Sequence, residues 1–326
     1  MTKRLAVFAY GLVSYVVFFL TFLYAIGFIG NLYVPRSLDS AARVPFWQAL
    51  LIDTLLLAAF AVQHSVMARP AFKRVLTRFI PVAAERSTYV LCASLALIAL
   101  FAGWQPIGGV IWNVADAAAR NAVNLLFGFG FALVFVATCL INHFDLFGLR
   151  QVFLYLMGKP YTHLEFRTPL FYKYVRHPLY VGWFIAFWAT PTMTGAHLLF
   201  AVLTSAYILM AIRWEERDLI MVHGARYENY RQQVPKLVPS LVPYRASKEP
   251  ALQPASVRPS KLVIRSASSR TTGRLLSSGS SAPTFRESRR DMQWNASSFM
   301  AQGVTRPRAC SAAAASESET PEEMVP

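Results

Sequence analysis

The sequence has 326 residues, of which 55% are hydrophobic and only 15% are charged, and its mean hydropathy is +0.38. This composition excludes two ordinary soluble domains and is typical of a membrane protein. The formal net charge of +15 fits nucleic acid, an anionic lipid surface or a bias toward cytoplasmic loops. The cysteines, Cys92, Cys139 and Cys310, are too few and too scattered for a disulfide framework or a cysteine-based metal site, so we expect no metal.

Long apolar runs predict transmembrane helices. Four of them are near the roughly 20 residues that cross about 30 Å of hydrocarbon: Leu5–Gly30, Phe46–Ala68, Tyr89–Trp112 and Asn121–Ile141. The first is longer than the core of a signal peptide, so we expect a retained anchor. Two arms of 15 residues follow, Leu179–Met193 and Leu198–Ile212. The sequence thus predicts an all-α, polytopic membrane bundle of five to six transmembrane helices, the last two forming a short hairpin.

Lys and Arg are unevenly distributed between these helices. Twelve lie at the N-terminus and in the loops 69–88 and 144–178, whereas the alternate connections hold only Arg36, Arg43 and Arg120. Cytoplasmic loops carry the excess of positive charge in membrane proteins. We therefore predict that the N-terminus and the C-terminus both lie in the cytoplasm.

The composition changes after Arg245. Residues 246–326 contain sixteen serines and no long apolar run, so we expect a disordered tail. The tail carries a net charge of +4 and leaves +11 on residues 1–245. The predicted organisation is a membrane domain over 1–245 and a Ser-rich tail over 246–326.

Polar clusters fall at the predicted cytoplasmic ends of the helices, at residues 63–65, 142–145, 176–178 and 215–218. Ionisable groups at helix ends are commonly interfacial anchors. Four clusters at one boundary nevertheless point to a pocket that could receive both a soluble cofactor and a membrane-permeable substrate.

The segment around Pro178 carries the clearest local chemistry. Proline suits the first position of a helix, and the free amides there form an anion site. Arg176 and His177 beside those amides could bind a carboxylate, and Tyr180 offers a hydroxyl and an aromatic face. The plain alternative is a helix cap.

Glu215 and Glu216 are adjacent at the far end of the hairpin. Successive side chains on a helix differ by about 100°, so one carboxylate should point inward. An inward carboxylate opposite a helix N-terminus and an arginine suits a zwitterion, since it can bind the ammonium group. A surface salt-bridge ladder is the alternative.

The C-terminal half resembles a known family through Tyr174-x-x-Arg176-His177-Pro178-x-Tyr180-x-Gly182, Glu215-Glu216 and Gly224-x-x-Tyr227-x-x-Tyr230-x-x-x-Val234-Pro235. This pattern is similar to the C-terminal signature of membrane methyltransferases related to isoprenylcysteine carboxyl methyltransferase and phospholipid N-methyltransferase. Motifs at 63–65, 85–87, 142–148 and 186–191 more closely resemble the nurim-like branch, and within it bacterial enzymes that convert methanethiol to dimethyl sulfide. Sterol reductases share a similar C-terminal signature, but the short N-terminal half argues against them.

The resemblance implies that S-adenosylmethionine is the cofactor and that Arg176, His177 and Tyr180 contribute to its site. Glu215 or Glu216 would bind the methionine ammonium group. The resemblance also implies a small thiol substrate, methanethiol, in the lipid bilayer of a bacterial inner membrane.

Methyl transfer to a thiol should require the thiolate, and simple alkanethiols ionise less readily than cysteine, whose reference pKa is about 8.5. His64, His143 and Asp145 are the candidates that could accept or relay the proton. The alternative is that His143 and Asp145 only cap the fourth predicted helix and that His64 packs against a neighbour.

Other functions remain open at this point. Methylation of a prenylated cysteine carboxylate or of a phospholipid amine would require a long groove facing the lipid. A non-catalytic nurim-like membrane protein, or an accessory protein of nitrogen-oxide metabolism, is a third possibility, although the intact Arg-His-Pro and Glu-Glu elements favour catalysis. Nucleic-acid binding is not supported, because the basic residues are distributed by membrane side. The sequence leaves the oligomeric state open.

Overall fold

The computed structural model describes residues 1–162, 164 and 166–245, so the predicted tail lies outside the described residues. Within this range the chain forms ten α-helices and one two-stranded ribbon, which confirms the all-α class. The helices are α1 (Thr2–Gly30), α2 (Phe46–Met67), α3 (Pro70–Leu76), α4 (Glu85–Gly103), α5 (Ala117–Ile141), α6 (His143–Leu146), α7 (Leu149–Leu156), α8 (Pro178–Trp188), α9 (Gly195–His223) and α10 (Ala225–Gln233). The strands are β1 (Val110–Asn113) and β2 (Thr192–Thr194), which pair antiparallel.

Among the described residues, five helical segments are long and apolar enough to cross a membrane: Thr2–Gly30, Phe46–Met67, Val82–Gly103, Ala117–Ile141 and Gly195–His223. Their outward faces present large apolar side chains to the surroundings, for example Leu20, Leu55 and Leu125. Such faces are stable in hydrocarbon and costly in water. The protein is an integral membrane protein.

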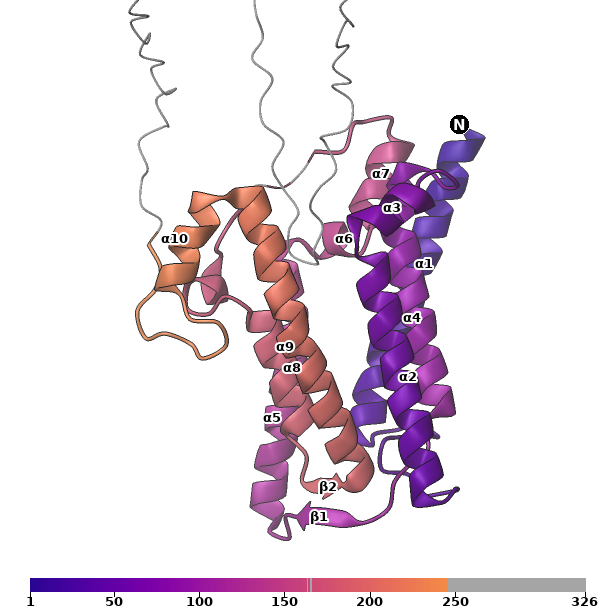
Figure 1. The fold of residues 1–326 in the computed structure, drawn as a ribbon, viewed down its shortest axis with the longest axis vertical. Coiled ribbons are helices and arrows are strands. Elements are labelled where there is room, and N and C mark those ends of the chain that lie inside the picture. The colour runs from indigo at the N-terminus through magenta and orange to yellow at the C-terminus, as the bar shows by residue number, and fades with distance from the viewer. Residues whose placement is uncertain (163, 165, 246–326) are drawn as a thin grey trace, which may run out of the picture.

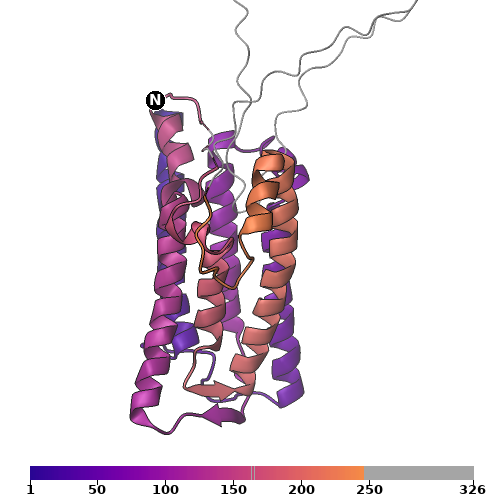
Figure 2. The ribbon, with the colours of Figure 1, turned by 90° about the vertical axis from the view of Figure 1, so that its left-hand side faces the viewer.

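Short elements gather at the two ends of the bundle. Figure 1 shows α3, α6, α7 and α10 at the same end as the N-terminus, and β1 and β2 at the other. Figure 2, turned by 90°, shows the long helices running between these ends. The loops rich in Lys and Arg therefore lie at one end, as the charge distribution predicted.

The last two helices differ from the predicted hairpin of equal arms. α8 has only 11 residues, whereas α9 has 29 and continues to His223. The apolar run stops at Ile212, but Glu215 and Glu216 are buried inside the protein, so the helix carries its charges inward and does not end there. The cluster 215–218 thus lies within α9 and not at its end.

The third predicted span is shorter than expected. α4 ends at Gly103, and Pro106 follows in the connection. Proline cannot continue a helix, because its ring clashes with the preceding turn and it lacks an N–H. The end of the predicted span instead forms β1, which pairs with β2 in the connection between α8 and α9.

Two glycines bring α5 and α8 into close contact. A Cβ atom on Gly130 would lie 2.7 Å from the backbone nitrogen of Ala186, and one on Gly182 would lie 2.8 Å from the carbonyl oxygen of Gly130. Small residues permit this approach, which van der Waals packing then stabilises in a membrane. The contact fixes the start of α8 at Pro178 relative to the end of α5.

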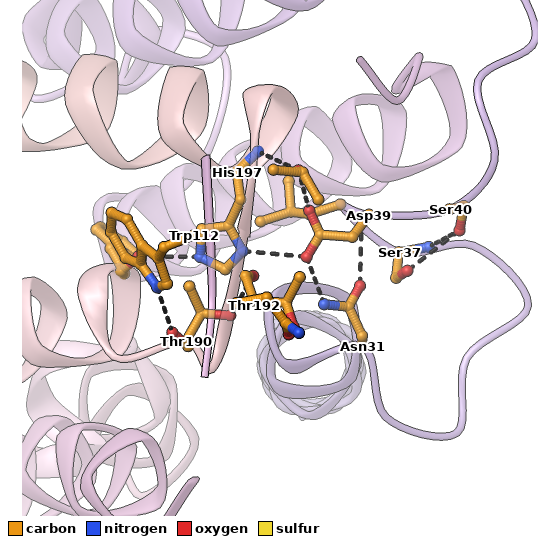
Figure 3. Close-up of polar contacts among 12 residues, drawn as sticks. Asn31, Ser37, Asp39, Ser40, Trp112, Thr190, Thr192 and His197 are labelled. Atoms are coloured by element: carbon orange, nitrogen blue, oxygen red, sulfur yellow. Dashed lines mark hydrogen bonds and ion pairs between the residues drawn. The ribbon is translucent and has the colours of Figure 1, made fainter. Parts of the chain in front are cut away.

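Asp39 joins three segments at the end of the bundle that carries the strands. Its carboxylate accepts hydrogen bonds from Thr194, from Asn31 Nδ2 at 2.5 Å and from His197 Nδ1 at 3.2 Å (Figure 3). His197 is fully buried, and its Nε2 lies 3.0 Å from the carbonyl oxygen of Phe187. This Asp39 clamp ties the α1–α2 connection to the N-terminus of α9.

Candidate functional site

A cavity of about 240 Å³ lies at the end of the bundle that carries α6 and α10. Ligand pockets in proteins are typically roughly 300–1,000 Å³, so its size approaches that of a small-molecule site. The cavity is lined by the end of α5, by α6, by residues of the connection at 164 and 166–177, and by residues of α9 and α10. The predicted site residues on its wall are Asp145, Arg176, His177 and Glu215.

Arg176 is held by the protein on every side of its guanidinium group. Its Nη2 lies 2.8 Å from Glu216 Oε1, and its Nη1 donates to the carbonyl oxygens of Arg231 and Val234 at 2.6 and 2.5 Å. A cation suits the carbonyl end of a helix, here that of α10. Arg176 therefore anchors α10 and the chain after it while it lines the cavity.

Glu216 completes this charged group from α9. Its Oε1 lies 3.2 Å from His177 Nε2, and its Oε2 lies 3.9 Å from Lys236 Nζ. The side chain is mostly buried, and a buried carboxylate is stable only with such partners. Glu216 neutralises the surrounding cations and does not line the cavity.

Glu215 lines the cavity, and only one of its two carboxylate oxygens accepts a hydrogen bond from the described residues. Tyr180 donates its hydroxyl proton to Glu215 Oε2 at 2.9 Å, whereas Oε1 is buried without a hydrogen-bond partner among the described residues. A buried oxygen of this kind costs free energy unless a ligand supplies a donor. An ammonium group in the cavity would satisfy it.

Three further polar atoms are buried in the same region without a hydrogen-bond partner among residues 1–162, 164 and 166–245. They are His177 Nδ1, the Tyr172 hydroxyl and the Tyr227 hydroxyl, and all three residues line the cavity. Burial raises the pKa of both tyrosines, so their hydroxyls stay protonated and can donate. The wall thus offers several unused polar groups to a polar ligand.

The N-terminus of α8 supplies a complementary site for an anion. His177 is its N-cap without a side-chain hydrogen bond to the first amides, Pro178 occupies the first turn, and Leu179 is buried. Amides at a buried helix start attract negative charge. With Glu215 near this start, the arrangement can bind the carboxylate and the ammonium group of one zwitterion.

Comparison with known proteins identifies the family. Over 237 residues the chain is 57% identical to the methanethiol S-methyltransferase of Crocosphaera subtropica, a match that covers 73% of this chain and 93% of that protein. The chain belongs to the methanethiol S-methyltransferase family. The enzyme of this name from Mycobacterium tuberculosis is 52% identical over 237 residues, covering 73% of this chain and 97% of the relative.

The more distant nurim of Xenopus laevis is 30% identical over 194 residues, covering 57% of this chain and 68% of nurim. The expected nurim-like branch is therefore confirmed. No protein-family model matches the chain, and no solved structure matches it.

His143 lies away from the cavity wall of this methyltransferase. Because Thr138 donates its hydroxyl to the carbonyl oxygen of Phe135, it can accept from His143 Nδ1 at 2.8 Å, and His143 Nε2 then accepts from Tyr15 at 2.9 Å. Burial lowers the pKa of His143, so its imidazole is neutral at neutral pH. The ring links α5 and α6 to α1.

Asp145 and His64 occupy different surroundings. Asp145 lines the cavity, where its carboxylate binds Arg150 at 2.8 Å and accepts from the Tyr161 hydroxyl at 3.2 Å. His64 lies on α2 beside Tyr89 of α4 and is not part of the cavity wall. The structure thus brings the predicted cofactor residues together but separates the three predicted proton acceptors.

Two tyrosines on the cavity wall, Tyr172 and Tyr227, were not predicted as site residues from the sequence. Tyr227 belongs to the spaced signature after Gly224, a signal that could have selected it, whereas Tyr172 lies just before the signature that starts at Tyr174 and is not part of it. Phenols in an apolar context resemble ordinary core residues until a cavity is seen beside them. Among the described residues, no group of three or more His, Cys, Asp or Glu side chains could hold a metal ion.

Proposed function

We propose that this chain transfers a methyl group from S-adenosylmethionine to methanethiol and so forms dimethyl sulfide. Membership of the methanethiol S-methyltransferase family supports the reaction class. The observation that carries the proposal in this chain is Glu215, a cavity-lining carboxylate with one buried oxygen that lacks a donor.

The cavity residues fit the amino-acid part of this cofactor. Glu215 Oε1 would accept from the ammonium group, with Tyr180 holding the other oxygen in place. The N-terminus of α8 and His177 would bind the carboxylate. Arg176 and Glu216 hold this end of α8 against α10 and α9, so they position the site more than they contact the ligand.

The hydroxyls of Tyr172 and Tyr227 would donate to the remaining polar atoms of the cofactor. When bound, S-adenosylmethionine supplies a methyl group on a positively charged sulfur. The protein residues orient it, exclude water and accept the proton of the thiol. We propose that this acceptor is among the predicted three, His64, His143 and Asp145.

We further propose that the protein lies in a bacterial inner membrane with both termini in the cytoplasm. The segregation of Lys and Arg to the end that carries the cavity supports this orientation. A cytoplasmic cavity can take up a soluble cofactor, while a small apolar thiol partitions into the bilayer. Residues 1–245 would form the complete catalytic unit, since the match to a relative covers 93% of that protein within 237 residues.

The test is to feed methanethiol to cells that express the full chain and to measure dimethyl sulfide in the headspace. We expect product from the wild type and strongly reduced product from Glu215→Gln at equal protein level. If folded wild-type protein makes no dimethyl sulfide but methylates a prenylated cysteine or a phospholipid amine, the proposal is wrong.

A further inference from the structure

A second polar cluster lies inside the bundle, where α2, α4 and α9 meet. The Tyr89 hydroxyl lies 2.8 Å from His64 Nε2 and 3.1 Å from Nδ1. In the same cluster, Ser65 follows His64 on α2, and its Oγ lies 3.0 Å from the Tyr207 hydroxyl. The cavity described above includes none of these four side chains in its wall.

His64 and Ser65 lie in the last turn of α2, and Tyr89 lies in the second turn of α4, so the cluster sits near the ends of these membrane-spanning helices. Polar side chains that are shielded from water there are costly unless they are hydrogen-bonded, and they often serve a function. Tyr89 is 3% exposed and His64 is half-buried, so the pair is largely shielded from water. A phenol beside an imidazole can give its proton to the ring and take another from a third group. The pair therefore has the parts of a proton relay.

The cluster is linked to the cofactor cavity through α8. Tyr180 donates to Glu215, which lines the cavity, and Tyr180 also lies within electrostatic range of Tyr89 and Tyr207. Tyr180 thus stands between the charged wall of the cavity and the polar cluster inside the bundle. A methyl acceptor on the inner side of Tyr180 would approach from the bilayer.

The charged and titratable groups that face the pair come from three helices. Arg86 of α4 places its guanidinium carbon 5.5 Å from the centre of the Tyr89 ring and also acts electrostatically on His64. Glu85 of α4, Tyr207 of α9 and Tyr180 of α8 also act electrostatically on the pair. The positive charge of Arg86 favours an anion beside it, so it stabilises a thiolate that forms at Tyr89.

We propose that Tyr89 and His64 form the deprotonation site for the thiol, an inference that rests on the proposed function. The S–H bond of the thiol breaks, its electron pair stays on sulfur, and its proton passes to the Tyr89 oxygen as Tyr89 gives its own proton to His64. The products are a thiolate and an imidazolium ion, so atoms and charge balance. In this relay Tyr89 contacts the thiol inside the bundle, and His64 takes the proton that Tyr89 releases.

The relay would supply the thiolate that methyl transfer requires. Methanethiol is mostly protonated at neutral pH, and only the thiolate is a good nucleophile. An acidic thiol such as trifluoroethanethiol arrives largely ionised and does not need the relay. Sensitivity to substrate acidity therefore separates a relay from a merely structural role.

The experiment compares wild type with Tyr89→Phe across pH, using methanethiol and trifluoroethanethiol. We expect Tyr89→Phe to lower kcat/KM for methanethiol by about 10²-fold at neutral pH. The remaining rate should rise about tenfold per pH unit, as the thiolate fraction in solution does. With trifluoroethanethiol the deficit should fall to less than about tenfold, as expected when the relay is bypassed.

Ser65→Ala is the matched control, because it removes the neighbouring hydrogen bond to Tyr207 and leaves the pair intact. It should keep the wild-type pH profile. A deficit in Tyr89→Phe that is equal for both thiols and independent of pH would overturn the relay.

A second readout does not depend on turnover. With a non-reactive ammonium analogue of the methyl donor bound, methanethiol should show thiolate ultraviolet absorbance at neutral pH in the wild type and not in Tyr89→Phe. Equal absorbance in both proteins would contradict the relay. A wild type that shows the thiolate signal but makes no dimethyl sulfide would instead contradict the proposed function.

Discussion

At the scale of single residues, the central group is Glu215. A charge-assisted hydrogen bond is worth about 1.5–3 kcal/mol, so Glu215→Gln should weaken S-adenosylmethionine binding by about 10- to 100-fold. The amide can still accept from Tyr180, and a buried charge is removed, so thermal stability should stay the same or rise. Calorimetry with S-adenosylhomocysteine and a thermal melt in detergent measure the two effects.

The matched control for this change is Glu228→Gln. Glu228 lies on α10, its side chain is 49% exposed and its ion-pair partner is Arg231. Exposed pairs of this kind contribute little, so the variant should bind the cofactor normally. Equal affinity of Glu215→Gln and wild type would remove Glu215 from the site.

Residue chemistry was predictable where a local pattern carried it. Arg176, His177, Tyr180, Glu215 and Glu216 do lie together, because a proline-initiated helix start and paired glutamates leave a mark in the sequence. The pairing of Arg176 with Glu216 and with carbonyl groups of α10 was not predictable, since it depends on how two distant segments meet. The same holds for Tyr172 and Tyr227, whose place on the cavity wall depends on how the connection 166–177 meets α10.

At the scale of elements, the contact between α5 and α8 sets the position of the cavity. Gly130→Ala places a Cβ 2.7 Å from the backbone of Ala186, so the helices must separate. Overpacking of this kind costs about 1–3 kcal/mol. We expect lower thermal stability and weaker cofactor binding, because the start of α8 moves with the helix.

Gly128, on the same helix, gives a matched control. Nothing lies within 4 Å of a Cβ atom added there. Gly128→Ala should leave binding unchanged and should favour the helix by up to about 1 kcal/mol. The same loss in both variants would show that the α5–α8 contact is not what matters.

The Asp39 clamp makes a prediction about pH. Burial alone would raise the pKa of Asp39, but hydrogen bonds from His197 and Thr194 outweigh it and hold the pKa below its ordinary value of 3.8. A lowered carboxyl pKa stabilises the fold fully above that ordinary value, and the contribution is lost as pH falls through the pKa of the folded state. Asp39→Asn should thus cost about 2 kcal/mol at pH 7.

Unfolding of wild type and Asp39→Asn should be compared between pH 7 and pH 3. The difference between them should stay constant down to about pH 5 and shrink below about pH 4. Asp116→Ala, which removes an exposed N-cap of α5, is the control and should cost about 1 kcal/mol. A difference that persists unchanged at pH 3 would argue that the Asp39 charge contributes nothing.

Apolar runs in the sequence predict the positions of helices more accurately than they predict where the helices end. The starts and ends of α2 and α5 lie close to the predicted spans, because proline, aspartate and a change of hydropathy coincide there. α9 extends 11 residues beyond the predicted end at Ile212, because Glu215 and Glu216 face the protein interior and not water. Hydropathy cannot separate a charge that ends a helix from one that lies in a site.

At the scale of the whole molecule, the two ends of the bundle have separate tasks. Figure 1 shows the strands at one end, where the Asp39 clamp also lies. The other end holds the cavity, the charged cluster and the loops rich in Lys and Arg. Of the net charge of +15, +11 lies on residues 1–245, and the Lys and Arg residues of this part are concentrated at one end of the bundle. The charged cluster of Arg176, Glu215 and Glu216 lies at the cavity end, where we propose the cofactor binds.

The most direct measurement uses the purified full chain in lipid, with S-adenosylmethionine that carries an isotopically labelled methyl group, and methanethiol. Mass spectrometry of the headspace should find dimethyl sulfide with one labelled methyl group, in an amount equal to the S-adenosylhomocysteine formed. Glu215→Gln should make far less of both products at low cofactor concentration. Unlabelled dimethyl sulfide, or none from folded protein that binds the cofactor, would contradict the assignment of this cavity to thiol methylation.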